Sequence, residues 1–237
     1  MNEKTGILYG VGVGPGDPEL MTLRAVRVLQ EADLLCLPQP EKETCRAYRI
    51  AVQAVPELAN KAWLGLDFPM ARDETRLHQA HERAYQRIRG QLRAGETLAF
   101  LTIGDPALYS TFTYLAGLAS ADGARVETVS GIASYHAAAA RLGIGLCEQD
   151  EELHIATGTS DLERALAMPG TKVLMKCGRQ LPRLKRLLEE QERAGQIRVY
   201  AVTDCGLVTE RVFRSAAALP ETADYMTTIL IKEKHPE

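Results

Sequence analysis

The chain lacks the features that mark several large classes of protein. Its five cysteines, Cys36, Cys45, Cys147, Cys177 and Cys205, are odd in number, widely spread and never in a Cys-x-x-Cys pair. A zinc site or a disulfide framework is therefore not expected. The longest apolar runs, such as residues 32–38 with Asp33 inside, fall far short of the ~20 residues of a membrane span. The N-terminus, Met1 to Lys4, has no signal-peptide core, so we expect a cytoplasmic protein.

An excess of positive charge is also missing. The 28 Lys and Arg residues are balanced by 31 Asp and Glu residues, which gives a net charge of −3. Electrostatics therefore do not draw the chain to nucleic acid. With 237 residues, 46% hydrophobic and 25% charged, the composition is that of a globular protein with one large or two small domains.

Sequence patterns typical of hydrolases or of metal sites are absent as well. There is no Ser-His-Asp order, no paired acidic motif and no Cys–His pair with a suitable spacing. His78 and His81 lie one turn apart in a predicted helix over residues 73–94, but no third ligand is in register with them. We expect these two histidines to lie on a solvated helix face rather than to bind a metal ion.

What the chain does have is a glycine-rich turn directly after a short apolar run. Residues 10–19 read Gly-Val-Gly-Val-Gly-Pro-Gly-Asp-Pro-Glu, and glycines at a strand end let bare backbone approach a ligand closely. The segment does not match the dinucleotide-binding motif GxGxxG, because Pro15 or Asp17 stands where the third glycine is required. It does not match a Walker phosphate-binding loop either, because that motif requires a lysine and this segment has none. Asp17 and Glu19 favour a ligand with a positive centre, although a tight turn without a ligand remains the alternative.

A second turn of this kind follows the predicted buried strand over residues 97–102. Ile103-Gly104-Asp105-Pro106 leads from that strand into a helix that we expect to be capped near Ser110. Two backbone-presenting turns at strand ends predict one crevice for a small molecule.

Short buried strands alternate with amphipathic helices along the chain, which is typical of an α/β layer fold. We predict two α/β domains in tandem, at residues 1–130 and 131–237, with a parallel sheet in the first. The predicted strands are 7–13, 33–37, 97–102, 126–129, 153–157, 171–175, 198–203 and 226–232. The predicted helices are 22–31, 73–94, 134–142, 161–167 and 181–194.

The segments Gly12 to Glu19 (GVGPGDPE), Gly104 to Thr111 (GDPALYST) and Ser130 to Ser134 (SGIAS) resemble the tetrapyrrole (corrin/porphyrin) methylases. These are S-adenosylmethionine-dependent methyltransferases, and the similarity extends over nearly the whole chain. Within the family, residues 137–144, 174–176 and 224–228 resemble the precorrin-2 C(20)-methyltransferases of cobalamin and porphyrin-type biosynthesis. Where the family usually reads Pro-Gly-Ile, this chain has Ser130, and Ala133 lacks a hydroxyl that the subgroup usually carries.

The resemblance implies a homodimer whose two domains hold the cofactor in the cleft between them. It implies that Asp105 anchors the methionyl amine and that Thr227 and Thr228 lie near adenine. The positions that match family cofactor contacts are Pro15, Ile103, Gly104, Asp105, Leu108, Ala133, Ser134, Met175, Lys176, Cys205, Gly206, Thr227 and Thr228.

Methyl transfer to an electron-rich tetrapyrrole carbon needs alignment more than a strong base. Tyr109 is a candidate for substrate contact, or an aromatic packed at a helix start. His136 is a candidate proton acceptor, or a buried structural histidine. The substrate's carboxylates would require cations, for which the candidates are Arg46, Arg49, Arg72, Arg76, Lys176 and Arg179.

Other interpretations stay open at the level of sequence. The acceptor is precorrin-2, with or without cobalt, or another tetrapyrrole position such as one on uroporphyrinogen III, or a ribosomal RNA cytidine or a modified histidine on an elongation factor. The net negative charge disfavours RNA. A non-catalytic tetrapyrrole or nucleoside binding protein would use the same cleft.

Overall fold

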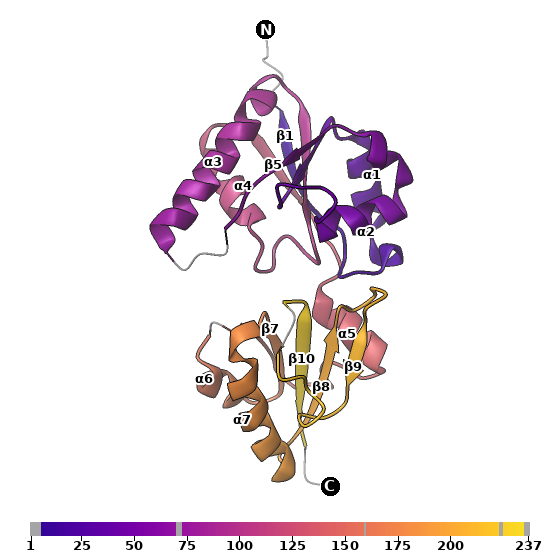
Figure 1. Ribbon diagram of the computed structural model, residues 1–237, viewed down its shortest axis with the longest axis vertical. Helices are drawn as coiled ribbons and strands as arrows, with labels where there is room; N and C mark the ends of the chain where they lie inside the picture. Colours follow the sequence, from indigo (N-terminus) through magenta and orange to yellow (C-terminus); the bar gives the residue numbers. More distant parts are fainter. Residues whose placement is uncertain (1–5, 70–72, 159, 223–224, 235–237) are drawn as a thin grey trace. The chain divides into compact units, whose positions relative to one another are not determined.

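The computed structural model describes residues 6–69, 73–158, 160–222 and 225–234 (Figure 1). The chain divides into two compact units, Met1–Ala133 and Ser134–Glu237, here called the N-terminal and C-terminal units. The sequence places this boundary between Ser130 and Gly131. The predicted mixed α/β class, with one sheet in each half of the chain, is confirmed.

The N-terminal unit is built on a five-stranded parallel sheet in the order β3-β2-β4-β1-β5. Helices α1 and α2 cover one face of this sheet and α3 and α4 the other (Figure 1). Phe100, Phe112, Ile88 and Leu98 lie in the core under α3 and α4. The elements are β1 Ile7–Gly12, β2 Leu34–Leu37, β3 Trp63–Gly65, β4 Thr97–Thr102, β5 Arg125–Val129, α1 Leu23–Glu31, α2 Arg46–Ala54, α3 Glu74–Arg93 and α4 Phe112–Ala121, with the 3-10 helices η1 Pro18–Leu20 and η2 Pro56–Asn60.

Local capping explains where the predicted helices begin and end. The Thr22 hydroxyl accepts a hydrogen bond from the Ala25 N–H at 3.1 Å, and the Asp73 carboxylate accepts one from the Arg76 N–H at 2.9 Å. Gly95 ends α3 with a φ of 84°, a conformation that glycine adopts without strain. Helix α2 was not predicted, because its N-cap residue, Cys45, offers no side-chain hydrogen bond.

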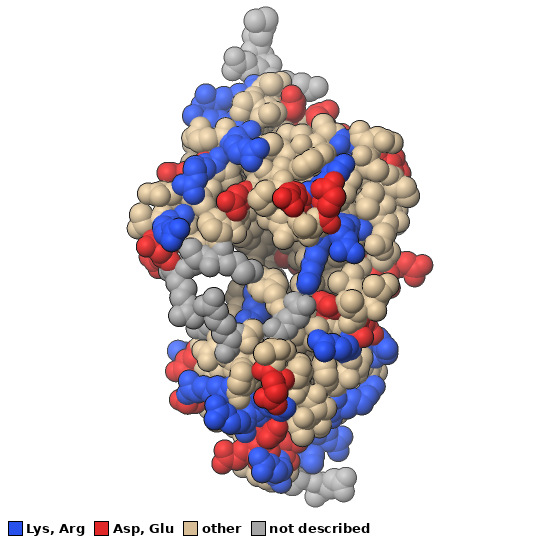
Figure 2. Space-filling view, viewed as in Figure 1, with Lys and Arg blue, Asp and Glu red and all other residues tan. Residues whose placement is uncertain are grey.

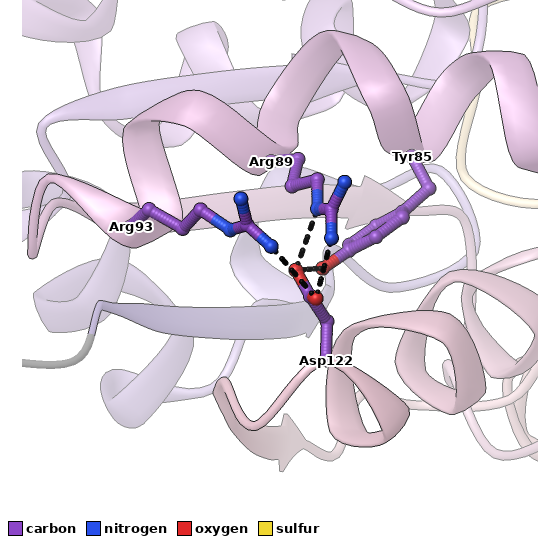
Figure 3. Close-up of polar contacts among 4 residues, drawn as sticks. All are labelled: Tyr85, Arg89, Arg93 and Asp122. Atoms are coloured by element: carbon purple, nitrogen blue, oxygen red, sulfur yellow. Dashed lines mark hydrogen bonds and ion pairs between the residues drawn. The ribbon is translucent and has the colours of Figure 1, made fainter.

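A charged cluster joins α3 to the end of α4 (Figure 3). Asp122 accepts two hydrogen bonds from Arg89, both at 2.7 Å, one from Arg93 at 3.0 Å and one from the Tyr85 hydroxyl at 2.8 Å. Arg89, Tyr85 and Arg93 together hold the pKa of Asp122 well below its usual range. Burial and the Asp122 hydrogen bond raise the pKa of Tyr85 to about 12. The cluster therefore ties the helices together at the end of the sheet where β5 begins.

The C-terminal unit has a mixed sheet in the order β6-β7-β10-β8-β9. Strands β6 and β7 pair in parallel, whereas β10 is antiparallel to both β7 and β8, and β9 is antiparallel to β8. Helix α5 lies on one face, and α6 and α7 lie on the other (Figure 1), where Leu184 and Leu188 join Ala201 and Ile229 in the core. The elements are α5 Ser134–Leu142, β6 Leu153–Thr157, α6 Leu162–Leu166, β7 Thr171–Met175, η3 Gly178–Gln180, α7 Leu181–Arg193, β8 Ile197–Thr203, β9 Arg211–Phe213 and β10 Thr227–Glu233.

On the face of the molecule drawn in Figure 2, basic and acidic side chains are interspersed. Among the described residues, no helix is long and apolar enough to cross a membrane.

Candidate functional site

Three loops meet at the carboxyl edge of the N-terminal sheet. The first loop (residues 13–17), the second loop (103–111) and the third loop (130–133) follow β1, β4 and β5, which are neighbours and run in parallel. The first and second loops are joined by a β-bridge, in which the Gly104 N–H donates to the Gly14 carbonyl at 2.7 Å. The two predicted turns therefore do lie side by side.

The close approach of the three loops depends on glycine. A Cβ atom added to Gly12 would lie 2.6 Å from the Gly104 carbonyl oxygen and 2.7 Å from the Gly131 nitrogen. A Cβ on Gly131 would overlap the same Gly104 carbonyl. We call Gly12, Gly104 and Gly131 the glycine junction. The absence of Cβ atoms at Gly12 and Gly131 is what allows the main chains of the three loops to pack directly against one another.

Asp105 connects the second loop to the third. One carboxylate oxygen accepts a hydrogen bond from the Ala107 N–H at 2.7 Å, and the other accepts one from the Gly131 N–H at 3.0 Å. Asp17 has a more local role, because its carboxylate caps η1 through the Glu19 N–H at 2.9 Å.

Tyr109 has an unusual backbone conformation at the far end of the second loop. Its φ is 49°, which is rare for a bulky residue and stores strain. Its side chain is 45% exposed, so it does not pack as an ordinary core aromatic. The next residue, Ser110, shares a hydrogen bond with the Thr102 hydroxyl at 3.1 Å and accepts one from the Phe112 N–H at 3.1 Å. The N-cap residue of α4 is Thr111, one position beyond Ser110, and its side chain makes no capping bond.

The C-terminal unit gathers its predicted residues at one edge of its own sheet. Because β7 and β8 both run antiparallel to β10, their carboxyl ends lie beside the amino end of β10. Met175 pairs with Thr228, and Thr203 pairs with Thr227, with 2.9 Å between the two threonine hydroxyls. The Thr228 hydroxyl donates to the Ser134 hydroxyl at 3.0 Å, which brings the start of α5 to the same place.

Two turns at this second edge have left-handed backbone. Lys176 follows β7 with a φ of 55°, and its Nζ lies 5.3 Å from the centre of the Tyr225 ring. Asp204 follows β8 with a φ of 52°, and its carboxylate accepts from the Thr209 hydroxyl at 2.8 Å. Non-glycine residues in this conformation are uncommon and concentrate at binding sites.

Glu210 holds the turn that contains Cys205 and Gly206. Its carboxylate accepts from the Gly206 N–H at 2.8 Å and from the Arg141 guanidinium. Burial raises the pKa of Glu210, but the Gly206 N–H and Arg141 outweigh it and hold that pKa below its usual value. This link could not be predicted from local sequence signals, since Arg141 and Glu210 lie far apart in the chain.

Each unit therefore assembles its share of the predicted cofactor contacts. Pro15, Ile103, Gly104, Asp105, Leu108 and Ala133 lie in the three loops of the N-terminal unit. Ser134, Met175, Lys176, Cys205, Gly206, Thr227 and Thr228 lie at the edge of the C-terminal sheet.

The two histidine expectations need correction. His136 is exposed on α5, so it is not a buried structural histidine. It lies two residues after Ser134 on the helix, and side chains at this spacing point to different faces. His81 was expected on a solvated face, but it is only 6% exposed and stacks on Tyr114 with 4.2 Å between ring centres. Burial lowers the pKa of His81.

The candidate cations for substrate carboxylates are scattered. Arg46 and Arg49 lie on α2, Arg76 lies in the first turn of α3, and Lys176 lies at the end of β7. Arg72 lies outside the described residues, as does the side chain of Arg179.

A cavity of about 1200 Å³ opens at the opposite edge of the C-terminal sheet, among residues that include Gly170, Arg198 and Lys232. Two ion pairs lie in or beside it: Lys232 lies 2.6 Å from Glu151, and the neighbouring Lys172 lies 2.5 Å from Glu233. Neither the predicted contacts nor the left-handed turns at the ends of β7 and β8 line this cavity, so it is separate from the candidate site.

The chain has two α/β units, with glycine turns and hydroxyl groups at the ends of their strands. These features indicate the class of protein to which it belongs. The chain belongs to the tetrapyrrole (corrin/porphyrin) methylase family, whose model matches residues 7–220. The family assignment made from the sequence is thus confirmed.

Individual relatives refine this placement. The chain is 40% identical over 177 residues, 74% of each chain, to a probable cobalt-precorrin-2 C(20)-methyltransferase of Methanocaldococcus jannaschii. It is 31% identical over 245 aligned positions, 95% of each chain, to a precorrin-2 C(20)-methyltransferase of a Sinorhizobium species.

Solved structures share the fold. A uroporphyrin-III C-methyltransferase from Thermus thermophilus superposes with a TM-score of 0.72 at 24% identity, covering 96% of this chain and 94% of that one. A structure of uroporphyrin-III C-methyltransferase from the same organism with S-adenosylhomocysteine bound has a TM-score of 0.69 at 20% identity, covering 96% and 92%.

Proposed function

We propose that this protein transfers a methyl group from S-adenosylmethionine to carbon 20 of precorrin-2 or of its cobalt-bearing form, giving precorrin-3A or its cobalt equivalent. The observation that supports this acceptor is that two relatives, at 40% and 31% identity, both carry C(20)-methyltransferase names. The meeting of three loops at the carboxyl ends of β1, β4 and β5 supports a small-molecule donor there, because ligands of open α/β sheets bind outside the carboxyl ends of the strands.

We propose that the residues matching the family's cofactor contacts hold the donor. In the N-terminal unit they are Pro15, Ile103, Gly104, Asp105, Leu108 and Ala133. In the C-terminal unit they are Ser134, Met175, Lys176, Cys205, Gly206, Thr227 and Thr228. When bound, S-adenosylmethionine supplies an electrophilic methyl group on a positively charged sulfur.

The protein's contribution to the reaction is alignment and the exclusion of water. Holding two reactants in a near-attack geometry is worth roughly 7–11 kcal/mol of a barrier, and an electron-rich ring carbon needs no covalent catalyst. Tyr109 is proposed to contact the tetrapyrrole, since it combines a left-handed backbone conformation with an exposed side chain. His136 stays a predicted proton acceptor, and Lys176 a predicted partner for a substrate carboxylate.

An anaerobic assay tests the acceptor. The purified protein is incubated with methyl-labelled S-adenosylmethionine and, in separate reactions, precorrin-2, cobalt-precorrin-2 and uroporphyrinogen III. We expect one of the first two to gain one methyl group by mass, with the label on carbon 20 by NMR. A label on another carbon, or methylation of uroporphyrinogen III alone, would establish a different ring position and overturn the proposal.

We also propose that the protein acts as a homodimer in the cytoplasm, as the family resemblance implies. Light scattering coupled to gel filtration should give twice the 26.0 kDa chain mass. A mass of one chain at assay concentrations would contradict the dimer, and recovery of the native protein outside the cytoplasmic fraction would contradict the location.

A further inference from the structure

The Asp105 side chain bonds to main-chain groups of both the second and the third loop. Its two carboxylate oxygens accept from Ala107 within its own loop and from Gly131 across to the next. Both oxygens are therefore engaged by backbone N–H groups before any ligand is considered. Hydrogen bonds from N–H groups to a carboxylate are stronger than bonds to a neutral acceptor.

The bond from Gly131 acts at the most crowded point of this edge. The Gly131 backbone packs against Gly12 and the Gly104 carbonyl, where a Cβ has no room. Gly104 itself has a φ of 73° and is bridged to Gly14. A carboxylate that holds Gly131 in place therefore also fixes the positions of the main-chain atoms around Gly104.

We propose that Asp105 is a positioning residue, whose carboxylate clamps the second loop to the third and thereby shapes the surface for the nucleoside part of the donor, rather than serving as the anchor of the donor's amine. This proposal rests on the proposed function, because it takes an adenosine-based donor as the ligand. This role differs from the one that the family resemblance suggests. The two roles predict different changes in affinity for ligands with and without the amine when Asp105 is substituted.

The test compares two ligands that share the adenosine and sulfur but differ in the amine. S-adenosylhomocysteine carries the amino acid group, and methylthioadenosine does not. In Asp105→Asn, the amide has one acceptor oxygen, and its NH₂ group faces a backbone N–H donor, so one of the two clamp bonds is lost. Calorimetry should show both ligands weakened by the same factor, about tenfold for one charge-assisted hydrogen bond.

Unequal losses would overturn the proposal. If S-adenosylhomocysteine is weakened about tenfold while methylthioadenosine is unchanged, Asp105 binds the amine. If neither ligand is weakened, the clamp does not shape the surface. If the unaltered protein binds neither ligand, the proposed function fails instead, and the clamp is then judged by hydrogen exchange. The Gly131 N–H should be protected in the unaltered protein and should lose protection in Asp105→Asn, and equal exchange in both would contradict the clamp.

Two further variants guard against a general loss of folding. Asp105→Glu keeps the charge but lengthens the side chain, so the clamp predicts equal weakening of both ligands, whereas an amine anchor would spare methylthioadenosine. Asp122→Asn makes the same chemical change at the opposite edge of the N-terminal sheet. It should lower the melting temperature while leaving both ligand affinities within about twofold, since its partners lie on α3.

Discussion

The two units present different kinds of surface at the edges where their predicted contacts gather. The N-terminal edge is built from main chain, with three glycines packed against one another and Asp105 bonded to backbone N–H groups. The C-terminal edge is built from side chains, with the hydroxyls of Thr203, Thr227, Thr228 and Ser134 in bonded pairs. A main-chain surface tolerates almost no added atom, whereas a side-chain surface loses one hydrogen bond at a time.

The largest effect should come from adding a single methyl group to the N-terminal edge. In Gly12→Ala, the new Cβ would meet the Gly104 carbonyl at 2.6 Å, so the loops must separate. We expect affinity for S-adenosylhomocysteine to fall by at least about a hundredfold and the melting temperature to drop, since overpacking costs about 1–3 kcal/mol or more. Calorimetry and thermal denaturation measure the two effects.

Gly117→Ala is the matched control, because a Cβ on Gly117 meets nothing within 4 Å on α4. Alanine in a helix should raise stability by about 0.5–1 kcal/mol, with unchanged affinity. Equal affinity of the Gly12 and Gly117 variants for the donor would show that the N-terminal edge is not crowded in the way described.

A smaller effect, confined to stability, should follow from titrating Asp122. Its pKa is lowered in the folded state, mainly by Arg89, so its contribution is present above the unfolded-state pKa of about 3.9 and is lost as the pH falls below it. The melting temperature of the unaltered protein should exceed that of Asp122→Asn at pH 7, and the difference should shrink as the pH is lowered through about 4. A difference that stays constant or grows in acid would contradict the ion-pair explanation.

The smallest effect should be found at the C-terminal edge. Thr228→Val keeps the shape of the side chain but removes the bond to Ser134, which is worth about 0.5–1.5 kcal/mol. We expect a loss of donor affinity of only a few-fold. A double-mutant cycle with Ser134→Ala should show that the two changes are not additive, and full additivity would mean that the hydroxyl pair does not act as a unit.

Much of this architecture could be predicted from local signals. The strand at residues 97–102 and the helix at 134–142 have the predicted bounds, and Thr22 and Asp73 cap the helices that they precede. These features depend on neighbouring residues, which a sequence displays directly. The glycine turns were predictable for the same reason.

Features that depend on distant residues were missed. The direction of β10 follows from its pairing with β7 and β8, and strand direction leaves no periodic trace in the chain. The short strand β9 and helix α2 carry weak local signals. His81 is buried because Tyr114 of another helix stacks on it, and the bond from Gly131 to Asp105 spans 26 residues.

The glycine junction has a consequence for how such a protein can change. Because its contacts are made by carbonyl and amide groups, the geometry of the junction follows from the path of the polypeptide rather than from the identity of the surrounding side chains. Side chains of neighbouring loop residues can therefore change without adding an atom at the point where Gly12, Gly104 and Gly131 meet.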